Sequence, residues 1–102
     1  MPLPVVYGRR VGPSLASAYG WYEEQRAGLG EEFLAAVDAS FDAIEMYPQM
    51  FAAVHGVVRR AIVSRFPYAV FYRVEPGQIL VLNVLHTASD PRSWPRPRIQ
   101  AR

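Results

Sequence analysis

Residues 57–85, VVRRAIVSRFPYAVFYRVEPGQILVLNVL, decide the fold because they contain three β-rich segments separated by turn-forming residues. The segments are 57–63, 68–74 and 79–85, and each is rich in the β-branched and aromatic residues that favour strands. Pro76-Gly77 predicts a tight turn between the last two, and Arg65-Phe66-Pro67 predicts a bend between the first two. The spacing therefore predicts a three-stranded antiparallel meander.

Side chains along these strands indicate which face meets the rest of the protein. In segment 68–74, Ala69, Phe71 and Arg73 alternate with the other residues, so one face can pack on helices while the other keeps aromatic residues and a charge. Segment 79–85 is apolar on both faces, which is typical of an interior strand. Arg59 and Arg60 are adjacent on a strand, so they are expected on opposite faces.

The residues before the meander predict one short strand and two helices. Val5 to Tyr7 suit an edge strand, and Ser14 offers an N-cap for a helix over about 14–27. Gly28-Leu29-Gly30 interrupts the helical period, and a second helix is expected to begin at Glu31 and to end before Pro48. We therefore expect an α+β fold: an N-terminal short strand and an antiparallel helix hairpin packed on a three- to four-stranded antiparallel sheet.

Length and composition limit the classes of protein. At 102 residues the chain is predicted to be a single domain, residues 1–102, with its core at about 5–94 and a flexible tail at 95–102. There is no cysteine, which excludes disulfides, thiolate nucleophiles and iron–sulfur clusters. The sequence has neither a membrane-spanning run nor a secretory signal, so we expect a cytoplasmic protein with no membrane partner.

Charge is distributed unevenly along the chain. Most acidic groups lie between residues 23 and 45, whereas most of the eleven cations, all of them arginine, lie from residue 59 onward. Arginine suits fixed, forked contacts to phosphate or carboxylate, so an anionic partner is one interpretation. A solvated basic surface is the other.

Four short motifs follow one another along residues 14–96 and together identify a family. They are Trp21-Tyr22-Glu23; Gly28-Leu29-Gly30-Glu31-Glu32-Phe33; Val58-Arg59-Arg60 running into Arg65-Phe66-Pro67-Tyr68-Ala69-Val70-Phe71-Tyr72; and Val84-Leu85-His86 followed by Asp90-Pro91-Arg92-Ser93-Trp94. In this order and spacing they resemble the RelE/ParE toxins of type II toxin–antitoxin systems. The resemblance implies the toxin fold of that family, growth inhibition, a role in plasmid stabilisation, and a cognate antitoxin that covers the toxin.

The resemblance leaves two targets, because one branch of the family cuts messenger RNA on the ribosome and the other poisons DNA gyrase. Positions that carry cations in the ribonucleases correspond to Ala69, about Ser89 and Ile62 here, and only Arg60 of that basic set remains. These departures favour the ParE-like, gyrase-poisoning branch, with no catalysis of its own. The alternatives are a ribosome-dependent mRNA endonuclease and an inactive homologue that only binds antitoxin, so enzymatic activity stays open.

Candidate site residues follow from the motifs. If the protein is a nuclease, the catalytic residues are expected to be Arg60, His86 and Arg92, since an imidazole beside arginines can act as acid or base. Otherwise His86 is expected to end a buried strand and to hydrogen-bond to Asp90 or to the backbone. The residues predicted to bind target or antitoxin are Arg59, Arg60, Arg65, Tyr68, Tyr72, Arg73, His86, Asp90, Arg92 and Trp94.

Several of these residues have a structural interpretation as well. Tyr72 can be a packed strand tyrosine, Trp94 can cap the core, and Trp21 and Tyr22 are expected to make core and hairpin contacts. His55 lies in a loop without ligand-type neighbours, so no metal and no cofactor are predicted. The partners expected are an antitoxin, gyrase or alternatively the ribosome with its message, and oligomers formed through the antitoxin. The antitoxin is expected on the helix hairpin and at a free sheet edge, held in part by charge.

Overall fold

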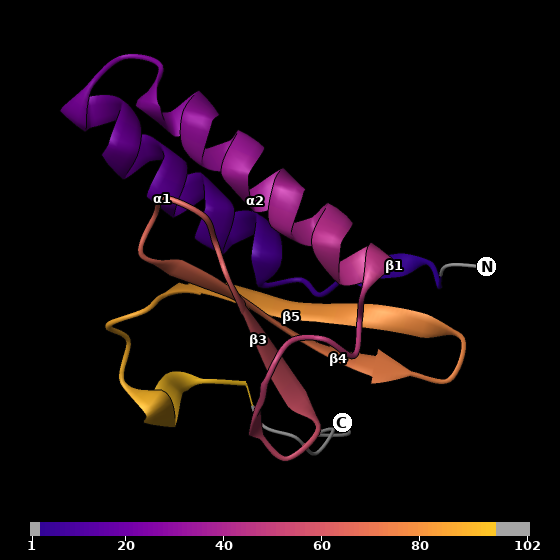
Figure 1. Ribbon diagram of the computed structural model, residues 1–102. Coiled ribbons are helices and arrows are strands. Elements are labelled where there is room, and N and C mark those ends of the chain that lie inside the picture. The colour runs from indigo at the N-terminus through magenta and orange to yellow at the C-terminus, as the bar shows by residue number, and fades with distance from the viewer. Residues whose placement is uncertain (1–2, 96–102) are drawn as a thin grey trace.

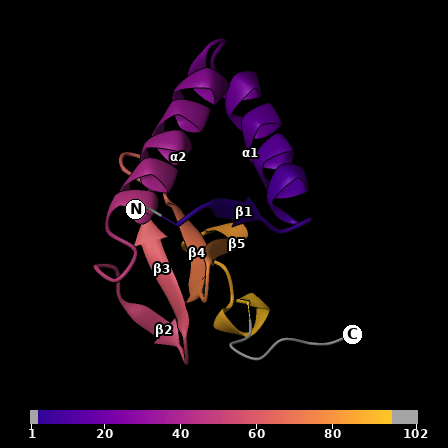
Figure 2. The ribbon, with the colours of Figure 1, turned by 90° about the vertical axis from the view of Figure 1, so that its right-hand side faces the viewer.

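The computed structural model describes residues 3–95, which form two helices packed on one face of a sheet (Figures 1 and 2). The elements are β1 (Val5–Tyr7), α1 (Val11–Gln25), α2 (Leu29–Met46), β2 (Ala53–His55), β3 (Val58–Ile62), β4 (Tyr68–Glu75), β5 (Gln78–His86) and the short 3-10 helix η1 (Pro91–Ser93). The sheet order is β1-β5-β4-β3-β2, in which β1 pairs parallel to β5 and the other pairs are antiparallel. The α+β prediction is confirmed. Most of the predicted tail, residues 96–102, lies outside the described residues.

The sheet has one strand more than the sequence predicts. The meander β3-β4-β5 and the edge position of β1 are confirmed, and β5 is an interior strand as expected. The additional strand is β2, which places His55 at the end of a strand rather than in a loop. β2 has three residues and pairs with β3 through a register that shifts between Ala53 and His55, and Gly56, which follows it, has φ = 60°. A strand of three residues is too short to show a residue pattern of its own, so β2 is recognised only from its pairing with β3.

Helix α1 begins earlier than predicted, and its start corrects the role expected for Ser14. The helix starts at Val11, the residue at its N-cap is Arg10, and no side chain caps it. Ser14 lies within the first turn, where its hydroxyl donates a 2.6 Å hydrogen bond to Oδ1 of Asn83 on β5. The serine thus joins α1 to the sheet, and it satisfies the side chain of a buried asparagine.

The connection between the helices is closed by a carboxylate. Helix α2 begins at Leu29, two residues before the predicted start, because Gly28 adopts φ = 91° at its N-cap. That left-handed conformation suits glycine. Glu23 on α1 accepts hydrogen bonds from the backbone N–H of Gly28 at 3.0 and 3.2 Å and from that of Gly30 at 2.9 Å. The carboxylate therefore serves as the missing cap of α2 and also faces the positive end of its dipole.

Replacing Glu23 with glutamine is expected to destabilise the protein by about 1–2 kcal/mol, the usual range for loss of a helix cap whose acceptor is charged. Urea unfolding followed by circular dichroism measures the change. Glu24→Gln, an exposed neighbour on the same helix, is the matched control and is expected to change stability by less than about 0.5 kcal/mol. Equal effects of the two substitutions would contradict the capping role.

The core has two parts, one on each face of the sheet. The larger lies between the helices and the sheet and is built around aromatic rings that include Phe33, Phe66 and Tyr72. The smaller contains Val58, Ala69 and Phe71 on the other face, with Trp94 packed against it. Figure 2 shows the segment after β5 crossing to that second face, away from the helices. The predicted alternation of β4 is thus confirmed, although both of its faces are buried.

Candidate binding faces of the sheet

The face of the sheet opposite the helices carries a stacked arginine. The guanidinium carbon of Arg60 lies 5.2 Å from the centre of the Trp94 ring, and that ring lies 5.3 Å from the ring of Phe71. Arg60 pairs in register with Phe71, which fixes the two on adjacent strands. We call Arg60, Trp94 and Phe71 the arginine–tryptophan stack. A cation held over an aromatic face has lost much of its freedom before any partner arrives.

Arg73 lies on the same face of β4 and is almost fully buried. Its Nε donates to Oε2 of Glu75 at 2.7 Å, and Gln78 donates to the other carboxylate oxygen at 2.8 Å. These hydrogen bonds, first that from Gln78 and then that from Arg73, lower the pKa of Glu75. Because Arg73 is 8% exposed, little of its side chain is available to a partner.

The segment after β5 is ordered by its own polar side chains. His86 accepts a hydrogen bond from the N–H of Ala88 on Nδ1 at 2.9 Å, so the alternative in which it bonds to the backbone is confirmed. Asp90 caps η1 by accepting from the N–H of Arg92, and the two side chains also form an ion pair at 2.8 Å. The turn thereby directs Trp94 onto the sheet.

Two predicted binding residues have structural roles on the helix side. Tyr72 is fully buried, and its hydroxyl donates to the carbonyl of Pro48 at 2.7 Å, so the structural interpretation is correct and a partner cannot reach it. Burial raises the pKa of Tyr72 to about 12. Arg59 donates to the carbonyls of Gln49 and Phe51 and to the Gln49 side chain. Together they hold the loop between α2 and β2 against the sheet.

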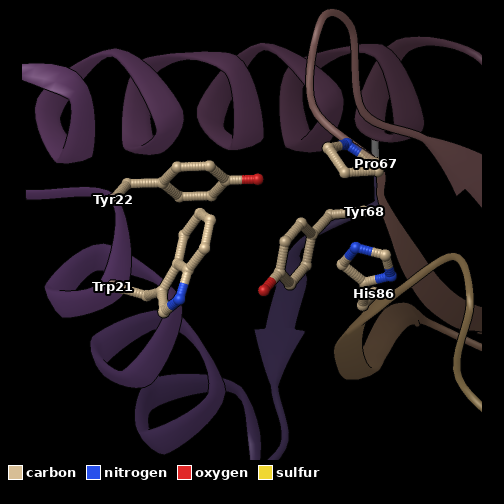
Figure 3. A pocket seen from close by; sticks show the side chains of 5 residues that line it. All are labelled: Trp21, Tyr22, Pro67, Tyr68 and His86. Carbon is tan, nitrogen blue, oxygen red and sulfur yellow. The ribbon is translucent and has the colours of Figure 1, made fainter. Parts of the chain in front are cut away.

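Tyr68 and His86 line a pocket on the helix side with residues from α1 (Figure 3). The pocket has a volume of about 510 Å³ and is lined by Trp21, Tyr22, Pro67, Tyr68 and His86. Tyr22 is buried in the core as expected, but Trp21 is 57% exposed, so its predicted core role is wrong. The helical period placed Trp21 next to a core residue, and only the fold reveals that its ring faces the pocket.

Arg65 lies in the turn between β3 and β4 with φ = 74°, a conformation uncommon for a residue other than glycine. Its exposed side chain reaches Glu32 on α2 at 3.1 Å, and Arg26 reaches the same carboxylate at 3.3 Å. The two arginines, Arg26 first, lower the pKa of Glu32. Arg65 thus joins the meander to the helices.

Stability is expected to fall as the solution is acidified. The pKa values of Glu32, Glu75 and Asp90 are all lowered in the fold. A lowered carboxyl pKa contributes stability that is present above the ordinary pKa and is lost as the pH falls through the folded-state value. Urea midpoints are therefore expected to decrease from about pH 5 downward. Glu32→Gln is expected to flatten this dependence, and an unchanged slope in that variant would contradict it.

The structure does not bring the predicted catalytic residues together. Arg60 lies on the face away from the helices, whereas His86 pairs with Tyr68 and contacts its ring at 5.2 Å on the helix side. Ile62 and Ala69 occupy two of the positions at which the ribonucleases carry cations. They are register partners on neighbouring strands, and both side chains are apolar. Across residues 3–95, no three His, Asp or Glu side chains cluster as metal ligands would, and neither helix is long and apolar enough to cross a membrane.

The helix hairpin on one face of the sheet defines a small α+β protein, and the arginine–tryptophan stack lies on the other face. Comparisons with known proteins agree with this fold class. The family model for the ParE toxin of the type II toxin–antitoxin system parDE matches residues 6–91, so the chain belongs to the ParE toxin family. A solved chain of the chromosomal ParDE system from P. aeruginosa has the same fold, with a TM-score of 0.60 and 20% identity over 82% of this chain and 95% of that one. No curated protein matches the sequence.

Proposed function

We propose that this ParE-type toxin inhibits growth in the cytoplasm by binding and poisoning DNA gyrase, without catalysis of its own, and that a cognate antitoxin neutralises it. The observation that carries the proposal is the separation of Arg60 from His86 on opposite faces of the sheet. Transfer at a phosphate needs an acid, a base and cations converging on one point. A binding function has no such requirement.

The surface best suited to the target is the face with the arginine–tryptophan stack. Arginine and tryptophan are the residues that most often dominate the energy of protein interfaces. Arg60 is partly exposed and pre-oriented by Trp94, so it can donate to a carboxylate or phosphate with little further loss of entropy. Asp90 and Arg92 form the rim of this face through the segment that carries Trp94.

The antitoxin is proposed to occupy the outer groove of the helix hairpin. This groove has a volume of about 420 Å³ and is lined by Gly12, Leu15, Ala16, Tyr19, Glu31 and Leu34. Small and aliphatic residues on both helices leave room for an apolar helix face of a partner. The outer edges of β1 and β2 offer unpaired backbone groups to a partner strand.

Inhibition of gyrase supercoiling by the purified protein tests the proposal. We expect dose-dependent loss of supercoiling that is reversed by antitoxin, and, in cells, an early arrest of DNA synthesis before protein synthesis falls. Cleavage of a ribosome-bound message that is abolished by His86→Ala would instead establish a nuclease. If expression of the folded protein without antitoxin is harmless to the cells, the protein is an inactive homologue that only binds antitoxin.

A further inference from the structure

The pocket between α1 and the β3–β4 turn has walls made almost entirely of aromatic rings. Trp21 and Tyr22 meet at 5.1 Å and 84°, Tyr22 and Tyr68 at 6.1 Å and 62°, and Tyr68 and His86 at 5.2 Å and 73°. Pro67 completes the lining. We call these five residues the aromatic box. Its volume of about 510 Å³ is within the range of about 300–1,000 Å³ usual for ligand sites.

The three ring pairs are T-shaped, so in each pair the edge of one ring meets the face of the other. The face of an aromatic ring carries partial negative charge, so a ring face left open to the pocket attracts a cation. Figure 3 shows the hydroxyl groups of Tyr22 and Tyr68 directed into this space. Neither hydroxyl has a hydrogen-bond partner within residues 3–95, so both oxygens can accept from an incoming donor.

The charges around the aromatic box also favour a cationic ligand. No arginine is among the described residues that line it, and the nearby Arg26 and Arg65 are both paired with Glu32. Nδ1 of His86 is engaged by the backbone N–H of Ala88, which fixes the orientation of the ring at the pocket. Trp21 and Tyr22 lie in the last turns of α1, whose carboxyl end carries the negative pole of the helix dipole.

We propose that the aromatic box is a binding site for a guanidinium group, presented by an arginine side chain of a protein partner. A guanidinium is flat, stacks on aromatic faces and carries five N–H donors, enough to reach both tyrosine hydroxyls. Lysine offers a compact, strongly hydrated ammonium that fits flat walls less well. The box is also larger than a guanidinium alone, and Pro67 and Trp21 at its rim can pack against the aliphatic part of the side chain.

Nuclear magnetic resonance titration of the intact protein with N-acetyl-arginine amide tests this site. Because the chain has two tryptophans, the Trp94→Phe background assigns the remaining indole N–H signal to Trp21. We expect saturable shifts of Trp21 and of the Tyr68 and His86 signals. N-acetyl-citrulline amide has the same shape without the charge and is expected to bind about tenfold more weakly, as loss of a desolvated cation–π contact implies.

Variants and a second probe separate the alternatives. Trp21→Leu removes an exposed wall and is expected to abolish the shifts of Tyr68 and His86, whereas Met46→Leu, a change at a residue of α2 that is 68% exposed, is expected to leave them intact. Ac-Ala-Arg-Ala-amide is expected to bind more tightly than methylguanidinium; the reverse order would favour a free small cation and overturn the protein partner. Equal binding of the citrulline probe, or tighter binding of N-acetyl-phenylalanine amide, would show an apolar pocket and overturn the guanidinium site.

Discussion

Replacing Phe33 with alanine is expected to lower the free energy of unfolding by about 3–5 kcal/mol, the range measured for large aromatic residues in cores. Phe33 is fully buried, and its ring contacts Tyr22 at 5.2 Å, Phe66 at 5.4 Å and Tyr68 at 5.0 Å. Small domains are stable by only about 5–15 kcal/mol, so this single change is expected to remove a large part of the total. Urea unfolding followed by circular dichroism measures it.

Met46→Ala is the matched control because it removes a side chain of similar length from the same helix at a position that is 68% exposed. Its effect is expected to stay within about 0.5 kcal/mol. Phe33 also supports Tyr22 and Tyr68 from behind, so the alanine variant is expected to weaken binding of arginine amide to the aromatic box. A loss of stability below about 1 kcal/mol would show that the core closes around the cavity more easily than this packing implies.

The order of the elements could be predicted from the sequence because it depends on local patterns. The meander follows from three β-rich segments separated by proline- and glycine-containing turns, and the hairpin follows from helical periods interrupted at Gly28. The start of α1 could not be found locally, because Ser14 is a good N-cap by type but its hydroxyl is engaged by Asn83, 69 residues away. β2 was missed for a similar reason, since a three-residue strand is stabilised by pairing with β3.

The candidate site was predicted as a list of residue types, and the fold divides that list. Arg60 and Trp94 came from separate motifs, and only the turn after β5 brings them into contact. Arg59 and Tyr72 are likewise an arginine and an aromatic residue, but they face the helices, where their hydrogen bonds hold the loop after α2. The aromatic box has contributions from α1, the β3–β4 turn, β4 and β5. No spacing along the chain indicates such a combination, although the exposed Trp21 marks it once the fold is known.

Arg60→Ala is expected to raise the concentration needed to inhibit gyrase by about 30-fold, which corresponds to the roughly 2 kcal/mol typical of a residue that dominates an interface. Trp94→Ala is expected to have nearly the same effect, because the arginine then loses the ring that orients it. The double variant is expected to be little worse than either single one, since both remove the same arrangement. Supercoiling assays over a toxin concentration series measure all three.

Arg26→Ala is the control for loss of one positive charge at a different place on the surface. It removes an exposed arginine on the helix hairpin and is expected to change inhibition less than about twofold. Arg60→Lys keeps the charge but replaces the flat fork, so an intermediate loss is expected if Arg60 makes forked contacts. Full activity of Arg60→Lys would reduce its role to general attraction, which salt would then screen. Full activity of both Arg60→Ala and Trp94→Ala, with unchanged unfolding midpoints, would move the target-binding surface off this face of the sheet.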